Sequence, residues 1–118
     1  MIKIEHLQKY FNRGKRSELH VLNDITLELP QTGLVCILGE SGSGKTTLLN
    51  TIGGLDVFQG GTLTLDETIL KKYEPKKIEH LRCEKFGYIF QNYYLLQDYT
   101  VAYNVKLALS HYDLTDEE

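Results

Sequence analysis

The chain is poor in cysteine, proline and long apolar stretches, and each shortage excludes a class of protein. Its 118 residues include two cysteines, Cys36 and Cys83, which match no metal-binding spacing and are predicted to be reduced thiols of a cytosolic protein. Two prolines and no internal repeat argue against a low-complexity linker. No apolar run is long enough to span a membrane, and the first residues lack the apolar core of a signal peptide. The sequence therefore predicts a cytoplasmic domain that reaches a membrane only through a partner.

Positive charge is also in short supply. The chain has 13 Lys and Arg residues against 16 Asp and Glu, which gives a formal net charge of -3. Proteins held to nucleic acid by phosphate contacts carry an excess of basic residues on one face. We therefore expect no nucleic-acid partner. The length suits one domain with a modest core.

Three of the ten glycines, in contrast, lie close together in one short segment. Gly39-Glu40-Ser41-Gly42-Ser43-Gly44-Lys45-Thr46 matches G-x-x-x-x-G-K-[ST], the loop that binds phosphates in nucleotide triphosphatases. The apolar residues 34–38 before it predict a buried strand, and residues 46–52, closed by Gly53-Gly54, predict a short helix. Strand, glycine loop and helix is the order that phosphate binding requires. A glycine-rich turn with an accidental lysine is the alternative, and a chance match in a chain of this size is rarer than about one in a hundred.

The residue types of this loop suit a triphosphate and its metal ion. Glycines let the backbone turn its amides inward, and the following helix offers unpaired amides and the positive end of its dipole. Lys45 supplies a mobile charge for the β and γ phosphates, and the Thr46 hydroxyl suits a Mg²⁺ ion that keeps most of its water. The predicted nucleotide-binding residues of the loop are Gly39, Glu40, Ser41, Gly42, Ser43, Gly44, Lys45, Thr46 and Thr47.

Apolar alternation and turn residues predict the remaining elements. Strands are predicted from alternating apolar and polar residues or from continuous apolar runs. They are expected at Ile2-Ile4-His6, 25–29, 62–65 with a return over 68–70, and 86–90. Polar loops are predicted over 12–18 and 71–77. Helices are predicted over 78–85 and from an N-cap at Thr100 through Leu109.

Further motifs extend the match beyond the glycine loop. Gly53-Gly54-Leu55-Asp56 follows the loop helix, Phe90-Gln91 follows the strand predicted over 86–90, and residues 92–96 and 99–105 come next. In this order the segments strongly resemble the ATP-binding subunits of ABC transporters, in particular those that serve lipoprotein release and the export of macrolides or antimicrobial peptides. The resemblance implies an α/β P-loop NTPase fold, the ABC ATPase nucleotide-binding domain. Residues 1–118 would be its N-terminal, strand-rich portion, with the phosphate-loop strand and helix, as far as the Q-loop.

The resemblance assigns roles by position. Phe11 falls where the family places an aromatic ring that stacks on adenine, with Tyr10 as the alternative. Gln91 falls at the Q-loop, whose amide reaches Mg²⁺ and the attacking water; a polar strand end is the alternative. Thr46 and Gln91 are thus the expected metal-binding residues, and Lys45 and Gln91 the expected catalytic ones. The implied cofactors are ATP and Mg²⁺.

The resemblance also implies partners and a location. The region from Tyr93 to Val105 would face a membrane-spanning transporter subunit, with half-buried packing of its tyrosines as the alternative. The family often has Glu where Tyr103 stands, so this surface departs from the family pattern. In the intact protein a second ATP-binding subunit would join, and ATP hydrolysis would drive movement of the membrane-spanning subunits. The chain would then lie at the inner face of the cell membrane.

Three motifs of the second half of the family are missing from this sequence. There is no Leu-Ser-Gly-Gly-Gln signature, no buried strand ending in Asp-Glu (the Walker B element) and no switch histidine. Residues 63–67 imitate the acidic strand, but threonines alternate with the leucines, which favours a hairpin. Since a catalytic base contributes about 10²–10⁴-fold, hydrolysis by this chain alone is expected to be negligible. A non-catalytic nucleotide- or partner-binding fragment is the first alternative, and another P-loop NTPase or kinase is the second.

Overall fold

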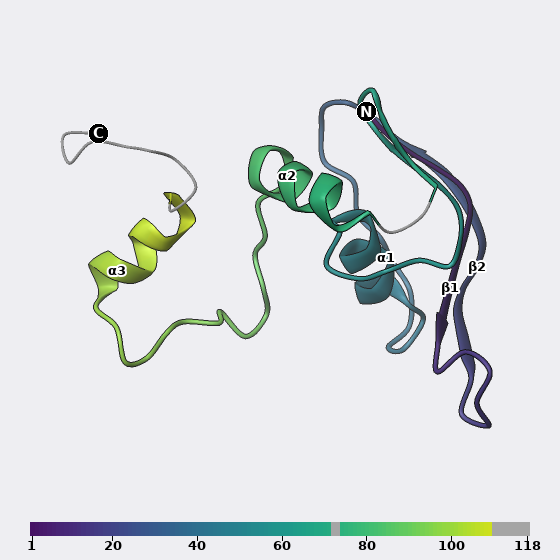
Figure 1. Cartoon of the computed structure of the whole chain (residues 1–118), viewed down its shortest axis with the longest axis horizontal. Helices are drawn as coiled ribbons and strands as arrows, with labels where there is room; N and C mark the ends of the chain where they lie inside the picture. The colour runs from purple at the N-terminus through teal and green to yellow at the C-terminus, as the bar shows by residue number, and fades with distance from the viewer. Residues whose placement is uncertain (72–73, 110–118) are drawn as a thin grey trace.

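The computed structural model describes residues 1–71 and 74–109. Its strands form a four-stranded antiparallel sheet in the order β2-β1-β3-β4 (Figure 1). The strands are β1 (Ile2–Phe11), β2 (Leu19–Leu29), β3 (Gly60–Leu65) and β4 (Thr68–Leu70). The helices are α1 (Lys45–Ile52), α2 (Pro75–Lys85) and α3 (Val101–Lys106), which a 3₁₀ turn extends over Leu107–Leu109. The predicted hairpin at residues 66–67 is confirmed, and a second hairpin joins β1 to β2 through the predicted loop 12–18.

A bulge in β1 changes which of its residues face the core. Pairing with β3 is irregular between Glu5 and Gln8, and His6 takes a left-handed φ of 53°. The bulge moves the next inward position from His6 to Leu7, which is fully buried like Ile4, whereas His6 is exposed. Opposite the bulge stands Gly61, where a Cβ atom would collide with the backbone of Glu5 and His6. The predicted opening strand is confirmed, and the bulge breaks the alternation of Ile2, Ile4 and His6 at His6.

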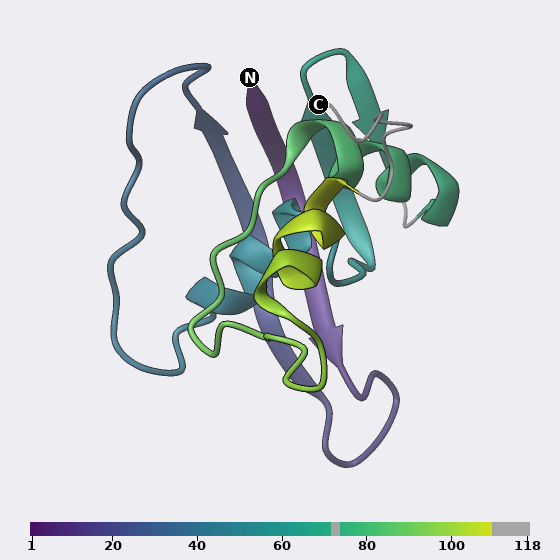
Figure 2. The ribbon, with the colours of Figure 1, turned by 90° about the vertical axis from the view of Figure 1, so that its left-hand side faces the viewer.

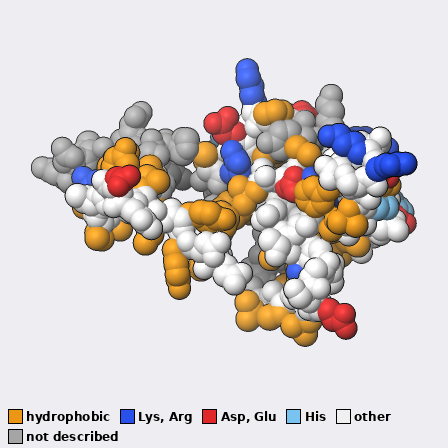
Figure 3. Space-filling model, turned by 90° about the horizontal axis from the view of Figure 1, so that it is seen from below, with side chains coloured by type: hydrophobic (Ala, Val, Ile, Leu, Met, Phe, Trp, Pro, Cys, Tyr) orange, Lys and Arg blue, Asp and Glu red, His pale blue; other side chains and the backbone are white. Residues whose placement is uncertain are grey.

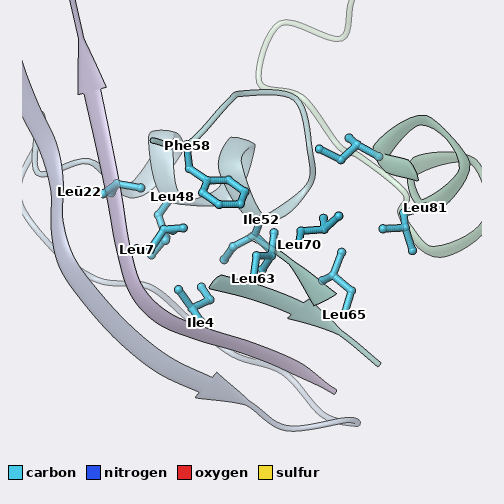
Figure 4. Packing of buried hydrophobic residues seen from close by; sticks show 11 residues of the cluster. Ile4, Leu7, Leu22, Leu48, Ile52, Phe58, Leu63, Leu65, Leu70 and Leu81 are labelled. Carbon is cyan, nitrogen blue, oxygen red and sulfur yellow. The ribbon is translucent and has the colours of Figure 1, made fainter. Parts of the chain in front are cut away.

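The core lies between one face of the sheet and the two helices α1 and α2. Figure 4 shows side chains of α1 pointing toward leucines of β1 and β3, with Phe58 beside them. The buried apolar residues are Ile4, Leu7, Leu22, Leu48, Ile52, Phe58, Leu63, Leu65, Leu70, Ile78 and Leu81. This packing fixes α1, and with it the glycine loop at its start, against the strands.

The segments 34–38 and 86–90 are not strands, which corrects two predictions. Leu34 and Leu38 are 91% and 90% exposed, and Ile89 is fully exposed. A continuous apolar run forms a buried strand only where neighbouring strands satisfy its amide and carbonyl groups. In the part of the chain that the structure describes, all strands belong to the antiparallel sheet, so these two segments have no parallel neighbours. The phosphate loop therefore follows an extended segment instead of the expected strand.

The helices follow their sequence signals closely. Residues 46–52 are helical as predicted, within α1. The helix predicted over 78–85 begins earlier, because Pro75 occupies its first turn, where a missing N–H costs nothing. The predicted N-cap at Thr100 is confirmed, since its Oγ1 accepts a hydrogen bond from the Tyr103 amide at 3.2 Å. In Figures 1 and 2 an extended segment leads from α2 to α3, which has no buried residue.

Candidate nucleotide-binding site

The glycine loop is curled at the N-terminus of α1. Ser43 donates its amide hydrogen to the carbonyl of Glu40 at 3.2 Å, and Gly44 is the N-cap of the helix. Gly42 and Gly44 have φ angles of 81° and 91°, a left-handed conformation that strains any residue with a Cβ atom. Gly44 is also crowded, because a Cβ there would lie 3.1 Å from Cγ1 of Val21 on β2. The loop backbone thus needs glycine at Gly42 and at Gly44, the second glycine of the motif.

The start of α1 carries backbone donors without acceptors in the helix. The first α-helical hydrogen bond runs from the Leu48 amide to the Gly44 carbonyl at 2.8 Å, so the amides of residues 45–47 precede it. No side chain caps the helix, and its first turn contains no acidic residue. The free amides and the positive end of the helix dipole therefore face the space that an anion would take.

Lys45 folds its side chain back over the loop. Its Nζ donates to the carbonyls of Gly39 at 2.8 Å and Glu40 at 2.5 Å, and to Oγ of Ser43 at 3.2 Å. All three acceptors are neutral, and the ion pairs of residues 1–71 and 74–109 do not include Lys45. A phosphate oxygen makes a stronger, charge-assisted hydrogen bond than these groups do. The ammonium is therefore already positioned beside the amides and can exchange its partners for phosphate.

Thr46 and Gln91 line one cavity of about 490 Å³ between α1 and residues 86–91. The hydroxyl of Tyr88 donates to the Gly53 carbonyl at the end of α1, which attaches this segment to the helix. Burial raises the pKa of the Tyr88 phenol, so it remains a neutral donor at physiological pH. A hydroxyl and an amide oxygen suit Mg²⁺, which completes its shell with water and phosphate oxygens. Within the described residues, no group of three His, Cys, Asp or Glu side chains is placed to hold a metal.

The two candidates for stacking on a base lie at the end of β1. In the pairing of β1 with β2, Tyr10 lies opposite His20 and Phe11 lies opposite Leu19. Val21, further along β2, lies against Gly44 at the start of α1. The Tyr10 ring stacks on the imidazole of His20 with centroids 3.9 Å apart, and the Arg13 guanidinium lies 5.0 Å from its centroid. Phe11 makes no ring–ring contact within the described residues and is 38% exposed. Of the two rings, Phe11 is therefore the one without an aromatic partner in the described part of the chain.

Sequence reasoning missed Lys9. Its side chain is only 3% exposed, and Nζ contacts Oδ1 of Asp56 at 2.5 Å and the Val57 carbonyl at 2.7 Å. The same nitrogen lies 4.6 Å from the centroid of the Phe11 ring. The alternation Ile2-Ile4-His6 places Lys9 on the outer face of the strand, and the bulge at His6 turns it inward, so no local signal predicted its burial.

The region from Tyr93 to Val105 is exposed rather than half-buried. Tyr93 is 81% exposed and Val101 82%, and Tyr99 stacks on Tyr103 with centroids 4.4 Å apart. Asn104 holds the region together, since its side chain exchanges two hydrogen bonds with the backbone of Leu96. The half-buried packing considered for these tyrosines is absent from the described part of the chain.

The motif G-x-x-x-x-G-K-[ST], curled at the uncapped start of a helix, defines the class of P-loop nucleotide-binding proteins. Comparison with known proteins gives the family. The model of the ABC transporter family matches residues 22–118, so the chain belongs to that family. None of the described helices has the length and apolar character of a membrane span.

Its relatives include larger transport proteins. The chain is 43% identical over 107 residues to the macrolide export ATP-binding/permease protein MacB of Aggregatibacter actinomycetemcomitans, covering 91% of the chain and 16% of the relative. It is 36% identical over 118 residues to MacB of Neisseria gonorrhoeae, covering the whole chain and 18% of the relative. The chain thus spans less than a fifth of these relatives.

A solved structure gives the same fold. The chain superposes with a TM-score of 0.88 and 30% identity on the ATP-binding cassette MJ0796, in a dimeric post-hydrolysis state bound to ADP and Pi. The superposition covers 99% of the chain and 51% of the cassette. A second dimeric structure of MJ0796, described as a bacterial ABC transporter cassette, matches with a TM-score of 0.85. The expected family and fold, the N-terminal portion of an ABC nucleotide-binding domain, are confirmed.

Proposed function

We propose that this chain binds ATP with Mg²⁺ as the N-terminal part, residues 1–118, of the nucleotide-binding domain of a transport ATPase. The observation that carries the proposal is the curled loop 39–47 at the uncapped start of α1, with the Lys45 ammonium held over it by neutral groups. The relatives support it, because they are named as ATP-binding/permease proteins and the matching cassette was solved with ADP and Pi.

Each residue has a distinct task in this proposal. The amides of the loop and Lys45 hold the phosphates, and Phe11 stacks on the base. Thr46 and Gln91, which line the same cavity, supply oxygen ligands to Mg²⁺. Bound Mg²⁺ would neutralise charge on the phosphates, while these side chains fix its position relative to the loop.

Hydrolysis needs a further group. No acidic residue lines the cavity that holds Thr46 and Gln91, so the described residues place no carboxylate base there. We therefore assign binding and positioning to this chain and proton transfer to an acid elsewhere in the intact ATPase. The second candidate function, a binding module without turnover, is favoured by the same observation. An intact ATPase that hydrolyses ATP and loses turnover with Gln91→Ala would exclude that candidate.

We assign the partner-facing role to the region from Tyr93 to Val105. The exposed tyrosines of this region, together with the exposed Val101 and Val105 of α3, suit burial against another subunit. The permease named in the relatives supports a membrane-spanning partner, and the dimeric cassettes support a second ATP-binding subunit. Through these contacts the chain would lie at the inner face of the cell membrane and couple ATP hydrolysis to movement of the permease.

The test is a titration with ATP and Mg²⁺ of the unmodified chain and of Lys45→Ala. Losing a charge-assisted contact of about 1.5–3 kcal/mol should weaken binding roughly tenfold to a hundredfold. Lys15→Ala, which removes a lysine from the exposed loop 12–18, is the matched control and should bind as the unmodified chain does. Equal affinities of Lys45→Ala and the unmodified chain would refute the assignment of Lys45.

A further inference from the structure

Lys9 carries a buried positive charge outside the phosphate loop. Burying an ammonium group is costly unless it is paired and hydrogen-bonded. Here the Asp56 carboxylate and the Val57 carbonyl accept hydrogen bonds from the Lys9 ammonium at 2.5 and 2.7 Å. The carboxylate is itself oriented, because Oδ1 of Asp56 also accepts from the Val57 amide at 2.8 Å. The cation is therefore fixed in one place.

The fixed cation lies against the proposed base-stacking ring. Lys9 Nζ is 4.6 Å from the Phe11 centroid, within the range of about 6 Å in which a cation is attracted to a ring face. A planar ring has two faces, and this contact occupies one of them. Because the Phe11 side chain is partly exposed, its opposite face remains available for stacking.

The ion pair of Lys9 and Asp56 also connects the Phe11 ring to α1, the helix that begins at the phosphate loop. The amides of Leu55 and Asp56 donate to the carbonyl of Asn50 in α1, at 2.8 and 3.2 Å. A continuous path of hydrogen bonds and one ring contact thus leads from α1 through Asp56 and Lys9 to Phe11. Movement of the ring relative to α1 would break one of these contacts.

From this path we infer that Lys9 and Asp56 are positioning residues of the nucleotide site. The Asp56 carboxylate holds the Lys9 ammonium behind Phe11, and the ring presents its other face to the base at a fixed distance from the phosphate-binding amides. The inference rests on the proposed function, and it adds residues that touch neither the base nor the phosphates. It requires that Lys9 affects the binding of the base and leaves the binding of the phosphates unchanged.

The experiment compares two probes on one preparation: ATP and inorganic tripolyphosphate, each with Mg²⁺. Their ratio of dissociation constants is independent of the active fraction and isolates the contribution of the base. Lys9→Met keeps the length of the side chain and removes the charge. Stacking of the base contributes at least about fivefold to affinity. Lys9→Met should therefore raise the dissociation constant of ATP roughly fivefold and change that of tripolyphosphate by less than about twofold. Lys3→Met, on an exposed lysine of β1, should change neither value.

A second comparison shows whether Lys9 acts through the ring. In a Phe11→Leu background, Lys9→Met should cause no further loss of ATP affinity, because the ring it positions is gone. If Lys9→Met leaves an unpaired carboxylate and unfolds the chain, Lys9→Met with Asp56→Asn removes both charges and is measured in its place.

The outcomes separate this inference from the proposed function. The positioning role is overturned, and ATP binding left intact, if Lys9→Met leaves the ratio of the two dissociation constants unchanged. The same holds if the effects of Lys9→Met and Phe11→Leu on ATP affinity add fully. Failure of the unmodified chain to bind either probe, or indifference of both probes to Lys45→Ala, overturns the proposed function and this inference with it.

Discussion

At the scale of single residues, the candidate site depends on backbone shape as much as on side chains. Gly42 and Gly44 adopt left-handed φ angles, and Lys45 contacts carbonyls of the loop that the glycines create. The motif made these residues predictable, because each one is required by local geometry. Lys9 was not predictable with the same ease, because its role depends on Asp56 and Phe11, which are brought to it only by the fold.

Gly44→Ala tests the demand for glycine at the helix start. A left-handed conformation costs a residue with a Cβ atom about 1–2 kcal/mol, and here the Cβ would also press on Val21. We expect Gly44→Ala to lower the melting temperature and to weaken ATP binding. Gly14→Ala is the control, since φ at Gly14 is 79° but no atom lies within 4 Å of a Cβ there. Equal losses for the two variants, in thermal unfolding and in ATP titration, would show that contact with β2 is irrelevant.

Asp66 gives a prediction about pH. A hydrogen bond from the ammonium group of Met1, together with its charge, lowers the pKa of this carboxyl in the folded chain. A group with a lowered folded pKa stabilises the fold above its unfolded pKa, and this contribution is lost as pH falls through the folded pKa. Asp66→Asn should therefore melt slightly below the unmodified chain at neutral pH, and the two melting curves should converge in acid. The difference is small because both partners are exposed. A gap that widens in acid would contradict this account.

At the scale of elements, turn and capping residues predicted the observed structure better than runs of apolar residues did. The hairpin at residues 66–67, the helix after the glycine loop and the cap at Thr100 follow from turn and capping residues, whose partners are a few positions away. Segments 34–38 and 86–90 were predicted as strands from their apolar residues alone. A strand needs hydrogen-bonded neighbours, and in the described part of the chain the sheet ends at β2 and β4 without pairing to either segment.

The cap of α3 offers a prediction at this scale. Thr100→Ala removes the acceptor of the Tyr103 amide and should destabilise the helix by about 1 kcal/mol. Because α3 has no buried residue, the loss should appear as faster hydrogen exchange at Tyr103 and hardly change the melting temperature. Thr100→Ser keeps the hydroxyl and should exchange as the unmodified chain does. Unaltered exchange in Thr100→Ala would show that the cap does not hold α3.

At the scale of the whole molecule, much apolar surface is uncovered. Hydrophobic side chains reach the surface at several places on the face shown in Figure 3, and Leu34, Leu38 and Ile89 are almost entirely exposed. Among the described residues, the two outer strands, β2 and β4, also leave unpaired edges. The chain matches 51% of a solved cassette, and we expect the remainder of such a domain to cover surfaces of this kind.

This surface predicts self-association. We expect the isolated chain to sediment as concentration-dependent oligomers, because exposed apolar patches and open edges favour contact between copies. Leu34→Glu combined with Leu38→Glu should shift the distribution toward monomer. The control is Leu19→Glu combined with Ile69→Glu, which places the same two charges on exposed residues of β2 and β4. A monodisperse monomer of the unmodified chain in sedimentation velocity would contradict this prediction.

The central claim is that the loop 39–47 binds the phosphates of ATP, and amide chemical shifts test it most directly. On titration with ATP and Mg²⁺, the amide resonances of Gly42, Gly44, Lys45 and Thr46 should shift together and saturate, and Lys45→Ala should require a higher concentration for the same change. Amides of the distant β4 should stay in place. Saturable shifts that spare the loop, or a loop that does not respond at any ATP concentration, would contradict the account.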